Sequence, residues 1–143
     1  MAANLKQIRA ALKATLVAYY ASHGVSIQVY DRVPGAIVSP AVVVEPASGE
    51  YQQTLGAIDR TQHMLAVTAL VATADVEAAQ DTLDQIISAV GSMSIAAGIL
   101  SDQTLGGVVE WANASGYRDY GTVSYANANY LKATVDVQTF GVS

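Results

Sequence analysis

The 143-residue sequence contains no cysteine, which excludes a disulfide framework and any site built on a thiolate. It is also poor in charge: charged residues make up 13% of the chain and hydrophobic residues 52%, whereas a typical globular protein has about 25% charged residues. A domain with so few charges has little polar material to cover its surface. We therefore expect part of that surface to be buried against other copies or partners. The alternative is that small Ala and Gly residues raise the apolar share without forming adhesive patches.

Positive charge is especially scarce, with 7 Lys and Arg against 12 Asp and Glu and a net charge of −5. Three of the basic residues, Lys6, Arg9 and Lys13, share the first segment, and the others stand singly. Direct binding of nucleic-acid phosphates depends on clustered Lys and Arg. We therefore expect no tight binding of DNA.

Catalytic patterns are missing too. The two histidines, His23 and His63, are followed by no histidine or carboxylate at i+3 or i+4, so neither has the spacing of a metal site. The chain lacks a Gly-x-Ser-x-Gly motif, and the Gly106-Gly107 pair lacks the Lys, Ser or Thr of a phosphate loop. We expect no catalytic, cofactor-binding or metal-binding residues and a non-enzymatic protein. A small-ligand or enzymatic α+β domain, with His63 and the acidic face of the second helix contributing to a cleft, is the alternative from a different class.

Long apolar runs are absent as well. The longest uncharged run, residues 85–101, is too short and too rich in Ser and Gly to cross a bilayer, so we expect no membrane association.

The chain is organised around residues 61–111. Both alternating residue sets of 62–72 are largely apolar, which predicts a central strand covered on both faces. A helix should follow, because apolar residues recur at three and four from Val76 to Val90 and Gly91 can end it in the left-handed conformation. The apolar residues of 105–111 then predict a returning strand.

The remaining segments complete a single α+β domain over residues 1–143. The sequence predicts a helix over 4–20 with an Asn4–Gln7 capping box, and a short helical piece over 94–100. Further strands are predicted at 25–30, 41–44 and 131–137, with a polar, Gly-punctuated connection at 113–121. Residues 45–60 form either a long loop or an extended hairpin. The expected architecture is one mixed, mostly antiparallel sheet of about five strands, with two main helices packed on one face.

Aromatic residues are the candidates for a subunit interface, because tyrosines set among Gly, Ser and Asn are typical of interfaces. Four tyrosines follow the single tryptophan within a short stretch, and residues 45–60 carry one more. The candidate residues are Tyr51, Leu55, Trp111, Tyr117, Tyr120, Tyr125 and Tyr130. The alternative is that these tyrosines belong to an outer strand pair that caps the core.

A second candidate surface is acidic. Glu77, Asp81 and Asp84 share one face of the predicted second helix at spacings of four and three residues. They form either the solvated face of an amphipathic helix or an acidic strip that faces a partner or lines a channel.

The order of several short motifs resembles a known family. They are Leu5-x-x-Ile8-x-x-x-Leu12, Pro40-Ala41-Val42-Val43-Val44, Ala78-Ala79-Gln80-x-x-Leu83-Asp84, Gly91-Ser92-x-Ser94-Ile95 and Ser101-Asp102-x-Thr104-Leu105-Gly106-Gly107. Together they resemble the tail terminator and head–tail joining proteins of long-tailed, siphovirus-type phages, notably those of actinobacterial hosts. The resemblance spans residues 5–137.

The resemblance implies a small structural protein of the virion, assembled in the host cytoplasm and located at the tail or neck. Such proteins form a ring, usually a homohexamer, that caps the tail tube and presents a surface to the head connector, while DNA passes through without tight binding. A head-closure or tail-tube role in the same assembly is the alternative within this class. The family has no site motif, so the resemblance assigns no functional residue.

Overall fold

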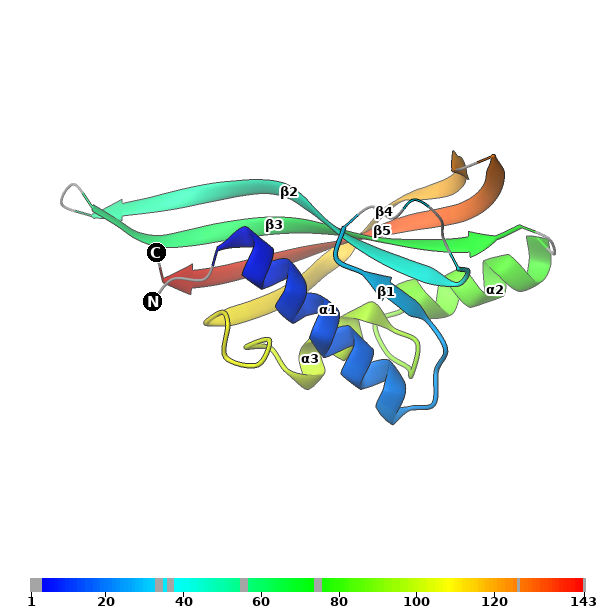
Figure 1. Ribbon diagram of the computed structural model, residues 1–143, viewed down its shortest axis with the longest axis horizontal. Helices are drawn as coiled ribbons and strands as arrows, with labels where there is room; N and C mark the ends of the chain where they lie inside the picture. The colour runs from blue at the N-terminus through cyan, green and yellow to red at the C-terminus, as the bar shows by residue number, and fades with distance from the viewer. Residues whose placement is uncertain are drawn as a thin grey trace.

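The computed structural model describes residues 4–32, 35, 38–54, 57–73, 76–125 and 127–142. Three helices and five strands follow one another along the chain (Figure 1). Their bounds are α1 Leu5–Ser22, β1 Gln28–Tyr30, β2 Ala41–Thr54, β3 Ala57–Ala72, α2 Val76–Ile87, α3 Ile95–Ser101, β4 Trp111–Tyr125 and β5 Ala128–Val142.

The strands form one mixed sheet in the order β1-β2-β3-β5-β4. The β1–β2 pair is parallel and the other three pairs are antiparallel. The predicted α+β architecture with a mixed, mostly antiparallel sheet is therefore confirmed, and so is the central position of β3.

Residues 45–60 belong to an extended hairpin. The β2–β3 pairing runs from Ala41↔Leu70 to Thr54↔Ala57, with register shifts between Pro46 and Ser48 and between Gln52 and Gln53. Figure 1 shows the paired strands continuing past the helices, and β5 accompanies β3 as far as Arg60↔Val142. We call the part of this hairpin beyond Val44, residues 45–54 and 57–60, the arm.

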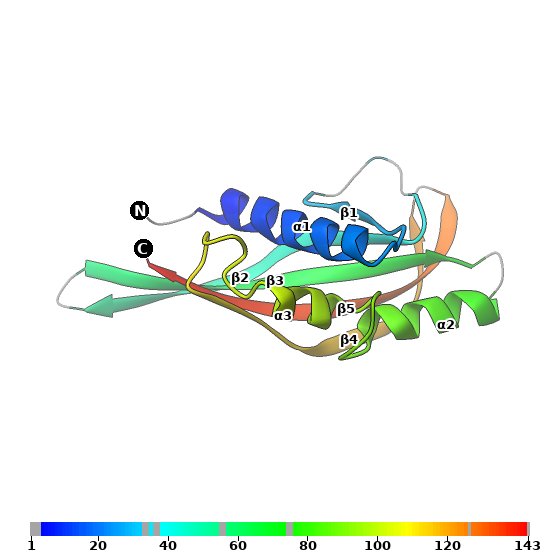
Figure 2. The ribbon, with the colours of Figure 1, turned by 90° about the horizontal axis from the view of Figure 1, so that it is seen from below.

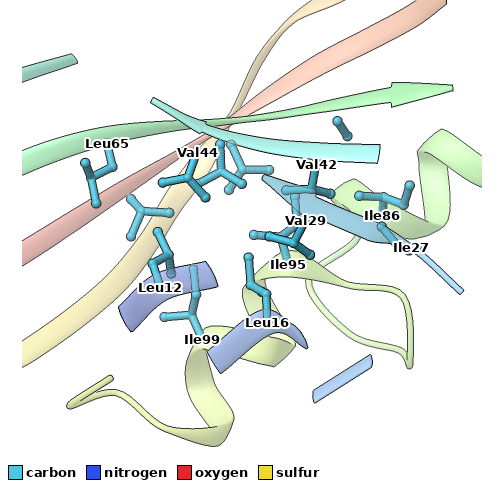
Figure 3. Close-up of a cluster of buried hydrophobic side chains, with 14 of the residues drawn as sticks. Leu12, Leu16, Ile27, Val29, Val42, Val44, Leu65, Ile86, Ile95 and Ile99 are labelled. Atoms are coloured by element: carbon cyan, nitrogen blue, oxygen red, sulfur yellow. The ribbon is translucent and has the colours of Figure 1, made fainter. Parts of the chain in front are cut away.

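One face of the sheet carries the main core. Alternate residues of the three central strands, such as Val44, Val67 and Val135, are buried in one cluster with apolar residues of all three helices. Figure 3 shows Leu12 and Leu16 of α1 and Ile95 and Ile99 of α3 on the same side of β2 as Val42 and Val44, in one cluster with them. Figure 1 shows the three helices on one side of the strands, and Figure 2 views the molecule from that side.

The opposite face of the sheet is only partly covered, which corrects the expectation that β3 is buried on both faces. Met64, Ala66 and Thr68 are half-buried there, and among the described residues of this β3 face only Leu70 is buried. Leu70 joins Val43 and Tyr130 in a small second cluster. The physical reason is that the buried apolar side chains described for the three helices all belong to the main core, so none of them covers this face.

The start of α1 is as predicted. The backbone N–H of Gln7 donates to Asn4 Oδ1 at 2.9 Å, and the Asn4 N–H donates to the Gln7 side chain at 2.8 Å, so both halves of the capping box are present. Gly24 follows the helix with a φ of 67°, as a glycine after a helix end should.

The end of α2 differs from the prediction. Leu83 and Ile86 are fully buried as expected, but the helix ends at Ile87, and Val90 is 74% exposed. Hydrogen bonds from α1 hold the following bend: Tyr19 donates its hydroxyl to the Gly91 carbonyl at 2.8 Å, and Tyr20 donates to the Met93 carbonyl at 3.1 Å. These tertiary contacts decide the chain path there.

The predicted strand over 105–111 is wrong. Residues 102–108 form turns, with positive φ values of 51° at Leu105, 72° at Gly106 and 89° at Gly107. The Asp102 carboxylate accepts hydrogen bonds from the Thr104 hydroxyl at 3.0 Å and the Gly106 N–H at 2.9 Å. The returning strand β4 begins at Trp111, so the predicted connection at 113–121 is also wrong.

Candidate interaction surface

The sheet has two open edges. In the described part of the chain, β1 pairs only with residues 41–43 of β2, so residues 44–54 have no strand on that side. Strand β4 forms the other edge. Both edge strands contain register shifts: those of β2 noted above, and two in β4, between Ala114 and Gly116 and between Arg118 and Gly121. Such irregularities oppose the addition of a further strand, so these edges favour recognition through side chains.

An aromatic pair lies where β4 begins and β5 nears its end. Trp111 and Phe140 are register partners, with ring centroids 5.2 Å apart and planes inclined by 37°. Trp111 remains 39% exposed, so its large ring is available to a partner. Trp111 was a predicted interface residue and Phe140 was not, because their pairing depends on the register between two strands.

The structure separates the other aromatic candidates. Tyr117 is 60% exposed and Tyr120 is also exposed, whereas Tyr130 is only 8% exposed and packs beside Val43 and Leu70. Tyr130 is therefore not on the exposed surface, which corrects that part of the prediction. The side chains of Tyr51 and Tyr125 and the whole of Leu55 lie outside the described residues.

Tyr120 connects the aromatic and acidic candidates. Its hydroxyl donates to Asp84 Oδ1 at 2.9 Å, although the two residues come from β4 and α2. Partial burial, and then the bond to Asp84, raise the pKa of Tyr120, so the hydroxyl stays a proton donor at neutral pH. Glu77 and Asp81 are exposed on the same helix. The predicted acidic residues thus lie on the surface, beside an aromatic residue that the sequence analysis had treated separately.

The partly covered face of the sheet has paired polar groups. Arg118 Nε donates to both carboxylate oxygens of Asp136 at 3.1 and 3.0 Å, and Thr68 and Thr134 share a hydroxyl contact of 3.2 Å. The bond to Asp136 raises the pKa of Arg118. Since Arg118 is exposed, this ion pair contributes little to stability.

The two histidines lie at different places in the fold. His23 follows α1, with Nδ1 2.9 Å from the Tyr19 carbonyl and its ring 4.4 Å from the Tyr19 ring. His63 lies half-buried in β3, and burial lowers its pKa. Within the described ranges, no group of three His, Asp or Glu residues could hold a metal ion. Among the helices of the same ranges, none is long and apolar enough to cross a membrane.

No protein-family model matches the chain, and no curated protein matches its sequence.

Proposed function

We propose that this chain is a structural subunit of a ring in a long-tailed phage particle, where it serves as the tail terminator between tail tube and head connector. The observation that carries the proposal is the arm, which continues the sheet beyond the helices (Figure 1). An element that projects from a small body can reach a neighbouring subunit.

Exposed aromatic residues support the same role. Trp111 and Tyr117 expose large amphipathic rings on β4. The chain as a whole is also rich in apolar residues and poor in charged ones. Buried aromatic anchors dominate the energetics of protein interfaces. In a ring, each subunit uses two different surfaces toward its two neighbours, and the contact must close on itself. The arm and the β4 aromatics are two separate surfaces of this kind.

The acidic balance supports passage of DNA without retention. With a net charge of −5, the chain offers few cations to hold phosphates, and its excess of negative charge repels them at short range. Repulsion extends over about 8 Å at physiological salt. In this proposal the ring is assembled in the host cytoplasm and resides in the tail or neck of the virion.

Particle mass and shape test the proposal. Native mass spectrometry and cryo-electron microscopy of the purified protein should show a closed ring with a central hole, of about six subunits if the family resemblance holds. Open filaments would favour a tail-tube role, because a head-to-tail contact that does not close produces a filament. A protein that stays monomeric at high concentration, alone and with tail tubes added, would contradict the ring.

A surface variant tests the aromatic contribution. Tyr117→Glu should lower assembly by at least about tenfold while the far-UV circular dichroism stays unchanged, because it introduces charge into an exposed aromatic contact. Thr122→Glu is the matched control, since Thr122 is an exposed residue of the same strand. Assembly that is equally strong in both variants would remove β4 from the interface.

A further inference from the structure

Opposite charges are separated onto two helices. Helix α1 carries Lys6, Arg9 and Lys13 and no acidic residue, whereas α2 carries Glu77, Asp81 and Asp84 and no basic residue. Three of the seven basic residues of the chain thus lie on one helix of a protein whose net charge is −5.

These charges do not neutralise each other within the chain. The structure gives no ion pair to the three basic residues of α1 among the described residues, and Arg9 Nε is buried without a hydrogen-bond partner. By contrast, Arg32 and Arg118 lie near carboxylates, at 3.7 Å from Asp31 and 3.0 Å from Asp136. Unpaired positive charge is therefore concentrated on α1.

The two helices face different neighbourhoods. Helix α3 packs against both α1 and α2, which lie apart along the sheet with little direct contact (Figures 1 and 2). A single copy therefore presents a basic and an acidic helix at separate places.

The outer side of α1 is shaped for another helix. One side of α1 exposes residues that recur at three and four and are small or aliphatic after the first: Lys6, Ala10, Ala14, Val17 and Ala21. Lys13 and Val17 also line a shallow groove between α1 and β1. Alanines allow two helices to approach closely, and the lysines add charge to the contact.

We infer that α2 of a second copy of this chain docks on the outer side of α1, with Glu77 and Asp81 facing Lys6 and Lys13. This inference rests on the proposed ring and names a contact that would build it. Because the two surfaces differ, each copy offers one to each neighbour, which is the head-to-tail arrangement that a ring needs. Complementary charge also selects this orientation over others between two acidic molecules.

Charge reversal tests the contact. One variant carries Lys6→Glu and Lys13→Glu, and a second carries Glu77→Lys and Asp81→Lys. Each alone should assemble at least about tenfold more weakly than the parent, because like charges then meet at every contact. An equimolar mixture should assemble again, since alternating copies place opposite charges at each contact. Arg32→Glu with Lys132→Glu is the control that reverses the same number of cations away from α1, and it should assemble like the parent.

Cross-linking gives a readout that does not depend on the strength of assembly. The chain has no cysteine, so Ala10→Cys and Gln80→Cys in one chain introduce the only thiols. Oxidation at high protein concentration should produce a ladder of covalent oligomers. Ala10→Cys with Thr122→Cys is the matched control, which should give no ladder.

The outcomes separate this inference from the ring itself. If both charge variants form rings and the Ala10→Cys/Gln80→Cys chain gives no ladder, the docking of α2 on α1 is overturned and the ring proposal stands. A failure of the mixture to assemble when both variants fold, as judged by thermal melting, would also overturn it. A parent protein that does not assemble, together with an Ala10→Cys/Gln80→Cys chain that gives no ladder, would refute both.

Discussion

The contact between α1 and α3 yields a prediction at Gly98. A Cβ atom added there would lie 2.9 Å from Leu16 Cδ2 and 3.3 Å from Tyr19 Cδ2. Leu16 is fully buried, so its side chain has little room to move away. Gly98→Ala therefore has two opposing effects on stability: it raises the helix propensity of α3, and it introduces steric overlap between α3 and α1.

The two effects differ in size. Replacing glycine by alanine inside a helix stabilises it by about 1 kcal/mol. Forcing extra volume into a well-packed core costs about 1–3 kcal/mol. For Gly98→Ala we expect a net loss of about 1 kcal/mol in the free energy of unfolding. Gly98→Val adds two further methyl groups to the same space and should cost about 3 kcal/mol or more.

Urea denaturation followed by circular dichroism measures these losses. The same Gly98→Ala change in a Leu16→Ala background is the decisive comparison, because the atom that the new Cβ approaches most closely is then gone. There the substitution should be neutral or stabilising. If Gly98→Ala stabilised the parent protein by about 1 kcal/mol, as it would in an exposed helix, the close packing of α3 on α1 would be refuted.

Three further predictions concern the core, the pH dependence and DNA. Leu83→Ala should lower the free energy of unfolding by about 2–5 kcal/mol, because it leaves a cavity. Asp81→Ala on the exposed side of α2 should change it by about 0.5 kcal/mol or less. Equal melting temperatures of the two variants would contradict the assignment of the buried face of α2. Burial lowers the pKa of His63 below its usual 6.5, so at pH values below 6.5 the unfolded chain binds more protons there than the folded one. The free energy of unfolding should therefore fall as the pH drops through 6.5, and His63→Gln should show a smaller fall; identical pH profiles would count against this cause. In a gel-shift titration at moderate salt, the isolated protein should leave duplex DNA unbound, and salt-sensitive micromolar binding would point instead to a basic surface assembled from α1 of several copies.

Local patterns were sufficient for much of the fold. The Asn4–Gln7 capping box and the start of α1 depend on residues within one helical turn, so the sequence predicted them correctly. The alternation along β5 was also predicted: Leu131 and Val135 are buried and Asp136 is half-buried, although Thr134 on the polar side is buried as well. Such signals need no knowledge of distant segments.

The wrong predictions share a dependence on distant contacts. Leu105 and Val109 are buried as apolar residues should be, but they reach the core from turns with positive φ values that Asp102 helps to stabilise. Apolar content alone cannot distinguish such a turn from a strand. Strand β4 was missed because an edge strand with exposed polar residues lacks the apolar alternation that marks a half-buried one.

For the candidate surface, the sequence determined the types of residue present, and the tertiary structure determined which of them lie next to one another. The sequence by itself identified a weakly charged chain with a group of tyrosines after Trp111, an acidic second helix and a basic first one. Only the strand register placed Trp111 against Phe140 and buried Tyr130, and only the packing of α2 brought Asp84 to Tyr120. Register and packing arise from the sum of many weak contacts between segments far apart in the chain, which no local pattern records.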